Sequence, residues 1–155
     1  MTINKVKITD GRLRIEYEEA SKVRPDSVNE FVLVCSEDPR PSFHKAMIEL
    51  LPHAMQLLEL ASYDSGCKVS GLSLSYSKSG VMGAVVTIQK ALKGANSPLV
   101  LNTPHCPAAP YSETGDWTTC LTSQFVTAIE DVCVEAEAYV KGARDQKVMD
   151  LAKAA

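Results

Sequence analysis

The segment from Lys5 to Tyr17 constrains the fold more than any other part of the chain. Apolar and polar residues alternate on both sides of the dipeptide Asp10-Gly11. Asp-Gly between two alternating segments is typical of a type I′ turn, the two-residue loop that joins the strands of a β-hairpin. Because this loop also sets the register, the hairpin has one predicted apolar face. Its members are Val6, Ile8, Leu13 and Ile15.

The opposite face of this hairpin is cationic. It carries Lys5, Lys7, Arg12, Arg14 and Glu16. Four cations on one sheet face are suited to phosphates or to an acidic partner, whereas the simpler alternative is an ordinary solvated face. Nearby glutamates dilute the positive charge, and aromatic residues that would stack on bases are not interleaved with it. Nucleic acid is therefore a possible partner but not the favoured one.

Two further segments complete the first half of the chain. Glu30–Cys35 is an apolar run rich in β-branched residues, which predicts a third strand in the interior of the sheet. After a proline-containing break, apolar residues recur at helical spacing from about Pro41 to Ser62. Pro52 lies inside this pattern and removes a backbone hydrogen bond, so we expect a kink near Ile48–Leu51 or two shorter helices.

The second half begins with another run of strands. Val69–Tyr76 and Val81–Gln89 alternate on either side of a Lys-Ser-Gly turn and predict a second hairpin. Pro98–Asn102 reads as a short strand that follows it, and its proline is typical of a strand start or a sheet edge.

A proline-rich loop and an acidic helix follow. Thr103–Gly115 has the proline density of an extended loop. Apolar spacing then predicts a helix that begins near Asp116–Thr119, runs to Val140 and ends at Gly142. Asp116 to Val140 contains five acidic residues and no Lys or Arg. Its outer face is either simply solvated or a docking surface for a basic partner, including mimicry of nucleic-acid phosphates.

Together these elements predict an α+β fold in ββ(β)α-βββ-α order, with an antiparallel sheet of about six strands packed against two main helices. We expect one domain over residues 1–142 and a short tail or helix over residues 143–155. The similar order of elements in the two halves suggests a structural repeat, although no sequence motif recurs.

Length and charge bound the class of protein. With 155 residues and a formal net charge of -3, the chain suits one globular domain without a global basic field for nucleic acid or anionic membranes. It shows no transmembrane run and no signal-peptide pattern. The five cysteines are scattered and odd in number, so a disulfide framework is not expected. These features predict a cytoplasmic protein.

No catalytic, cofactor or metal motif stands out. The glycines form neither a dinucleotide-binding loop nor a P-loop, and the histidines and cysteines lack metal-ligand spacing. His105-Cys106 is an adjacent base and nucleophile, but neighbouring residues seldom reach the geometry of a Cys-His enzyme. We therefore expect no enzyme activity, no cofactor and no metal.

A ligand pocket is expected where the proline-rich loop meets the last helix. His105, Tyr111 and Trp117 lie in this region, and aromatic residues there either cover the core or anchor a partner or a planar ligand. With the four hairpin cations, these three residues complete the predicted set of binding residues.

Several short segments resemble small accessory proteins of tailed bacteriophages and prophages. They are Lys5–Tyr17, Leu50–His53, Leu101–Pro104 and Ala138–Gly142. We expect the resemblance to cover nearly the whole chain. The resemblance implies the cytoplasm of a bacterial host during infection and an accessory role, sometimes encoded near recombination functions. It implies no particular site residue.

These observations favour a non-enzymatic accessory protein that acts by stoichiometric binding, as a counter-defence factor would. The expected partner is a host or phage protein or a nucleotide-like small ligand. The alternative is an accessory factor of phage DNA replication or recombination that contacts nucleic acid through the first hairpin. A homo-oligomer is a further possibility, for example through an edge strand such as Pro98–Asn102.

Overall fold

The computed structural model describes residues 1–147, 151 and 153, and its architecture is the predicted α+β fold. The strands are β1 (Thr2–Thr9), β2 (Arg12–Ala20), β3 (Val28–Cys35), β4 (Cys67–Tyr76), β5 (Met82–Lys90), β6 (Leu99–Asn102) and β7 (Cys106–Pro107). The helices are α1 (Pro41–Leu57) and α2 (Ser123–Val140), with 3-10 turns η1 (Ala61–Tyr63) and η2 (Trp117–Thr119).

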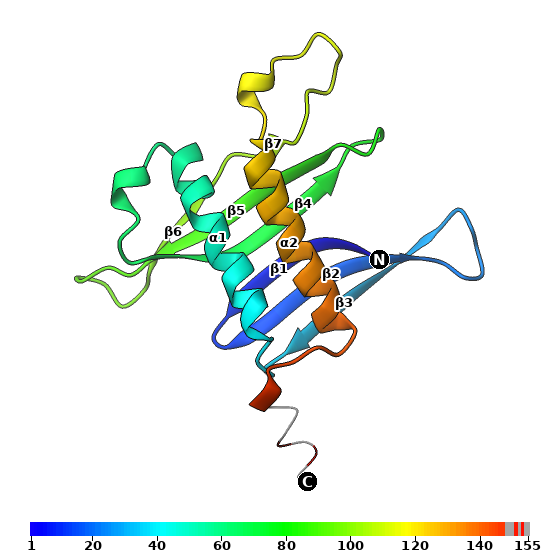
Figure 1. Cartoon of the computed structure of the whole chain (residues 1–155), viewed down its shortest axis with the longest axis horizontal. Coiled ribbons are helices and arrows are strands. Elements are labelled where there is room, and N and C mark those ends of the chain that lie inside the picture. Colours follow the sequence, from blue (N-terminus) through cyan, green and yellow to red (C-terminus); the bar gives the residue numbers. More distant parts are fainter. Residues whose placement is uncertain (148–150, 152, 154–155) are drawn as a thin grey trace.

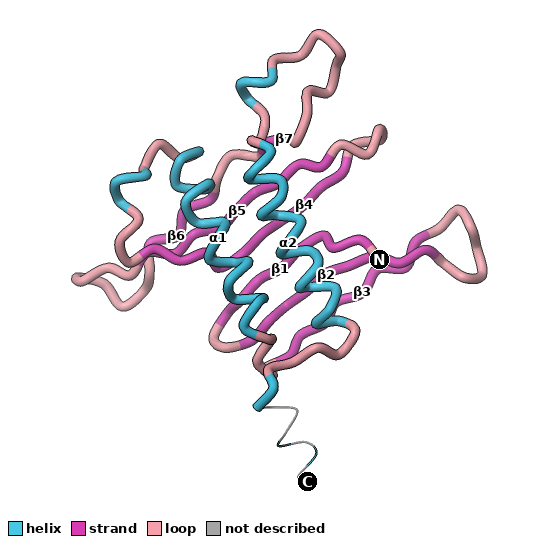
Figure 2. The backbone as a smooth tube through the Cα atoms, viewed as in Figure 1, coloured by secondary structure: helices cyan, strands magenta, loops and turns pink. Residues whose placement is uncertain are grey.

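The strands form one antiparallel sheet in the order β3-β2-β1-β4-β5-β6, and β7 pairs with β5 next to the end of β6. Both helices cross the same face of the sheet (Figure 1). Figure 2 shows the strands as a single layer behind the two helices. The predicted two-helix layer on an antiparallel sheet is therefore confirmed.

The first hairpin has the predicted register. Thr9 pairs with Arg12, and Val6 pairs with Ile15. Asp10 and Gly11 have φ angles of 51° and 74°, and a type I′ turn requires positive φ at both positions. Val6 and Ile15 are fully buried on the helix side. The alternation of a strand then sends the hairpin cations to the other side.

Two irregularities keep the apolar residues of the central strands on the helix side. The register shifts between Ile3 and Lys5 in β1, and between Val69 and Gly71 in β4. Ile3 and Val69 are each three residues from the next core residue of their strand, an odd spacing that a regular strand would divide between its two faces. Each bulge restores the phase, so all of these residues are buried.

The prediction that the third strand lies inside the sheet was wrong. β3 is an edge strand, and Val32 and Val34 are 54% and 48% exposed. A β-branched apolar run indicates a strand, but its place in the sheet depends on pairing with distant segments. Here β1 pairs with β4 on its second side, so β1 and not β3 becomes the interior strand.

The first helix is one continuous element from Pro41 to Leu57, despite Pro52. Of the two expected alternatives, a kink or two shorter helices, the second was therefore wrong. Pro52 is exposed, so the carbonyl of Ile48 that loses its partner lies on the side of the helix that faces water. The helix ends earlier than predicted, because Glu59 adopts a positive φ of 58°.

The second helix begins at Ser123, a few residues later than predicted. Thr122 caps it by accepting a hydrogen bond from the Phe125 N–H at 3.1 Å. Gly142, with a φ of 112°, follows its C-terminus as predicted. The expectation of a tail or helix over residues 143–155 falls in part on residues outside the described ones.

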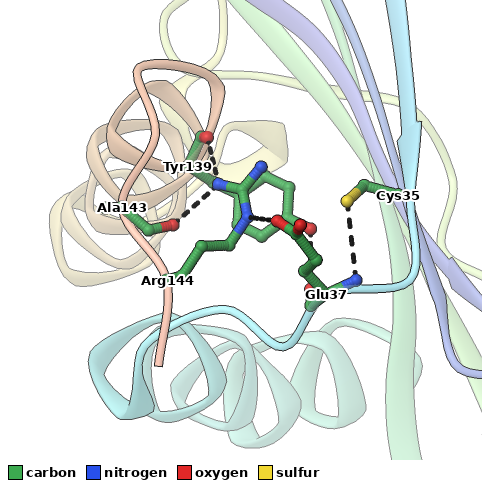
Figure 3. Close-up of polar contacts among 5 residues, drawn as sticks. All are labelled: Cys35, Glu37, Tyr139, Ala143 and Arg144. Carbon is green, nitrogen blue, oxygen red and sulfur yellow. Dashed lines mark hydrogen bonds and ion pairs between the residues drawn. The ribbon is translucent and has the colours of Figure 1, made fainter. Parts of the chain in front are cut away.

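A polar cluster joins the end of α2 to the segment after β3. Figure 3 shows the guanidinium of Arg144 between the carboxylate of Glu37 and the carbonyls of Tyr139 and Ala143. The Tyr139 hydroxyl donates to the Glu37 carbonyl at 2.7 Å, and Arg144 stacks 3.6 Å from the Tyr139 ring centroid. We call this group, with Cys35, the Arg144 clasp.

Candidate functional site

The candidate site lies on the face of the sheet opposite the helices, which we call the open face. Among the described elements no helix covers it (Figure 1). One row of side chains crosses all of its main strands in register. From β3 to β6 the row consists of Val34, Arg14, Lys7, Gly71, Thr87 and Asn102. A second row alongside it contains Val32, Glu16, Lys5, Ser73 and Val85.

The cations predicted from the hairpin lie on this face. Lys7, Arg12 and Arg14 are exposed, and Lys5 is half-buried. Arg14 forms an ion pair with Glu16 at 3.0 Å, so its charge is partly neutralised. Lys5 and Lys7 form no ion pair with any described residue. The two lysines therefore keep their charge for a partner.

A shallow depression lies beside the two lysines. Its volume is about 490 Å³, and it is lined by Lys5, Lys7, Gly71, Ser73, Thr87 and Asn102 among others. Gly71 has no side chain, so the floor is open between Lys7 and Thr87. The Thr87 hydroxyl donates to the Asn102 side-chain oxygen at 2.7 Å. The depression thus combines two ammonium groups with uncharged hydrogen-bonding groups.

His105 also lies on the open face, next to the second hairpin. A Cβ on Gly83 would overlap the imidazole, so the absence of a side chain at Gly83 makes room for the ring. His105 Nε2 and Ser75 Oγ share a hydrogen bond at 2.8 Å. A nucleophilic triad needs a further group on the second ring nitrogen, and among the described residues no carboxylate bonds to it.

Cys106 points away from its neighbour. It pairs with Ala84 on the helix side and is buried in the core, whereas His105 lies on the open face. Burial raises the pKa of the Cys106 thiol, with a further contribution from Cys120. The two adjacent residues therefore do not form a base and nucleophile pair.

The two predicted aromatic residues lie elsewhere. Trp117 lines a separate cavity of about 720 Å³ at the start of α2, with Leu121, Thr122 and Val126. Tyr111 is exposed in the loop between β7 and η2. The structure thus places five of the seven predicted binding residues on the open face and separates Trp117 from them.

The acidic helix is less negative than its sequence indicates. Arg40 donates to both carboxylate oxygens of Glu135, at 2.7 and 3.1 Å. This hydrogen-bonded pair lowers the pKa of Glu135. Lys141 pairs with Glu137 at 2.6 Å and, chiefly through this hydrogen bond, lowers its pKa. Cations from outside the helix therefore neutralise part of its acidic surface.

Sequence reasoning missed the uncharged half of the site. Gly71, Ser73 and Ser75 alternate with core residues of β4, and this period already indicated that they share one face. Nothing local indicated that β4 would pair with the cationic strand β1. The sequence around Gly83 gave no indication of its role, because that role depends on His105, which lies between β6 and β7.

Neither a metal site nor a membrane span is present in the described part of the chain. No group of three or more His, Cys, Asp or Glu residues in it is arranged to hold a metal ion. None of the helices within the same residues is both long and apolar enough to cross a bilayer. In comparisons with protein-family models, curated proteins and solved structures, nothing matches this chain.

Proposed function

We propose that this protein is a non-enzymatic binding protein whose open face holds a phosphate-bearing ligand of about nucleotide size. The observation that carries the proposal is the pairing of β1 with β4. It sets Lys5 and Lys7, which form no ion pair with a described residue, directly beside Ser73 and Gly71. Ammonium groups supply the charge that attracts a phosphate, and hydroxyl and amide groups beside them supply orientation.

The size of the depression is consistent with a small ligand. Ligand sites in proteins typically enclose about 300–1,000 Å³, and this depression measures about 490 Å³. Thr87 and Asn102 lie beyond the open floor at Gly71, where they can contact the sugar or base of a nucleotide whose phosphate is held by the lysines. Val85 and Val100 provide an apolar border.

Single-stranded nucleic acid is the second candidate, because Arg12 and Arg14 extend the cationic surface along the first hairpin. Single-strand binders combine such a surface with aromatic side chains on which bases stack. Within the described residues, the strand positions of the open face hold no Phe, Tyr or Trp. The small ligand is therefore the favoured proposal.

The resemblance to phage accessory proteins suggests a biological role for such binding. In an infected bacterial cell, a protein that binds a nucleotide-like signal stoichiometrically would withhold it from the host. This is how a counter-defence factor can act without catalysis.

Isothermal titration with inorganic phosphate, a mononucleotide, a cyclic dinucleotide and a single-stranded oligonucleotide tests the proposal. We expect the wild type to bind a nucleotide. The double variant Lys5→Glu/Lys7→Glu should lose at least ~10-fold in affinity, about 1.4 kcal/mol. Gly71→Val should also weaken binding, because its side chain would fill the floor without changing any charge.

The matched control is Lys78→Glu/Lys93→Glu, which makes the same change of charge on two exposed lysines in turns away from the open face. It should bind as the wild type does. Equal losses in both double variants would mean that only net charge matters. Binding of the oligonucleotide alone, with a steep dependence on salt, would favour the second candidate.

A further inference from the structure

β3 is a long and regular edge strand. Its eight residues pair with β2 over eight consecutive positions without a bulge. No described strand pairs with its other side. In an antiparallel ladder, alternate residues direct their N–H and C=O groups to each side, so this edge presents a row of backbone groups ready to bind another strand.

The side chains of this edge are apolar and exposed. Val32 and Val34 lie on the open face, and Phe31 on the helix side is 39% exposed. Proteins usually blunt an edge strand with Lys, Pro, a bulge or short length. β3 has none of these features, whereas β6 at the opposite edge has four residues and lies between Pro98 and Pro104.

We infer that β3 pairs antiparallel with β3 of a second copy of this chain, which joins two sheets into one. The charge pattern favours self-pairing. Glu30 is the only charged residue of β3 and lies off its centre. In a two-fold pairing centred on Phe31, Val32 or Leu33, Glu30 opposes Val32, Val34 or Ser36, so it never meets its own copy. Around the centre, apolar side chains from the two copies cover one another.

The cationic residues do not oppose this pairing. Arg14 lies one strand in from the edge, beside Val34. In the joined sheet, the two copies of Arg14 are at least three strand spacings apart, about 14 Å. This exceeds the Debye length of roughly 8 Å at physiological salt, so their repulsion is largely screened.

The edge is also held in place before any partner arrives. The Arg144 clasp fixes the backbone just after β3, through Glu37. On the helix side, Phe31 stacks on Tyr17 with 5.2 Å between the ring centroids. A strand that is ordered in advance loses less conformational entropy when it pairs.

Sedimentation velocity over a range of concentrations tests this inference. The wild type should be a dimer that dissociates on dilution, and Val32→Lys should be a monomer under the same conditions. The matched control is Val100→Lys, because Val100 is an equally exposed valine on the same face of the opposite edge strand. It should remain a dimer.

Hydrogen exchange of the wild type gives a second measurement that does not depend on how a variant folds. The outward amides of β3 should be protected at high concentration and lose protection on dilution. The inference would be overturned if the wild type stays monomeric at all concentrations. It would also be overturned if Val100→Lys disrupts the dimer and Val32→Lys does not, or if the exchange rates of the β3 amides do not change with concentration.

Discussion

The two halves of the chain share an order of elements but contribute different chemistry to the open face. The first half, β1 to α1, places cations there through Lys5, Lys7, Arg12 and Arg14. The second half, β4 to α2, contributes small or uncharged groups at Gly71, Ser73, Ser75, Gly83 and Thr87. The first strand of each half lies at the centre of the sheet, and its third strand lies at an edge. The lysine side chains and the space left open by Gly71 therefore lie side by side where β1 pairs with β4.

This difference indicates how a binding surface can arise from a simple sheet. Neither half has both the positive charge and the open floor, and only their junction has the two together. The same junction carries the core on its other side, where Val6 pairs with Leu72 and Leu72 with Val86. The stability of the fold and the geometry of the site thus depend on one pair of strands.

The largest expected effect on stability comes from removing a buried side chain at the β1–β4 junction. Leu72 is 1% exposed, so Leu72→Ala should lower the free energy of unfolding by about 2–5 kcal/mol through lost burial and a residual cavity. Urea denaturation measures it, with Val100→Ala as an exposed control that should change stability by less than about 0.5 kcal/mol. Two separate transitions in the wild type would show that the halves unfold independently.

The reactivity of the cysteine thiols should also differ between the two halves. In the first half, the Tyr139 hydroxyl and then the Glu37 N–H lower the pKa of Cys35. In the second half, burial and then Glu130 raise the pKa of Cys133 from 9.0 to about 11. Two pKa units reduce the thiolate of Cys133 by about 100-fold near neutral pH. Iodoacetamide labelling followed by peptide mass spectrometry should therefore find Cys35 modified well before Cys133 or Cys106. Equal rates would contradict this assignment.

A smaller effect is expected from Gly83→Ala. The added methyl group takes the place of the His105 imidazole, which must swing away and lose its hydrogen bond to Ser75. Because the ring is exposed and can move, the cost should be about 1 kcal/mol, the value of one hydrogen bond. Shifted His105 ring resonances in proton NMR would confirm the displacement, and unchanged resonances would contradict it.

The smallest effect concerns the ion pair of Arg40, which precedes α1, with Glu135 in α2. Arg40 holds the pKa of Glu135 below its ordinary value of 4.5. Such a group contributes stability above the pKa of the unfolded chain and loses it as the pH falls through the folded pKa. Arg40→Ala should therefore be less stable than the wild type at pH 7, and the difference in melting temperature should shrink as the pH falls below 4.5. A difference that is constant with pH would exclude this pair as its cause.

Local patterns predicted most of the fold, and contacts between distant segments account for the errors. The Asp10-Gly11 turn and its flanking alternation were sufficient for the register of β1 and β2. The same kind of reading placed β3 in the interior, because apolar content does not report which strands become neighbours. For the site, the sequence predicted the cations and His105 but not Gly71 or Gly83. The missing side chain makes room for His105 at Gly83 and leaves the floor of the depression open at Gly71, and both effects depend on segments distant in the sequence.

The Arg144 clasp has a consequence for how the chain is made. Glu37 and Arg144 are 107 residues apart in the sequence. Proteins are synthesised from the N-terminus, at about 5–20 residues per second. The segment after β3 therefore gains this contact only after α1, β4 to β7 and α2 have all been synthesised. During that interval Arg144 does not yet hold the backbone after β3. The edge strand of a nascent chain is therefore less ordered for pairing with β3 of another chain on the same messenger RNA.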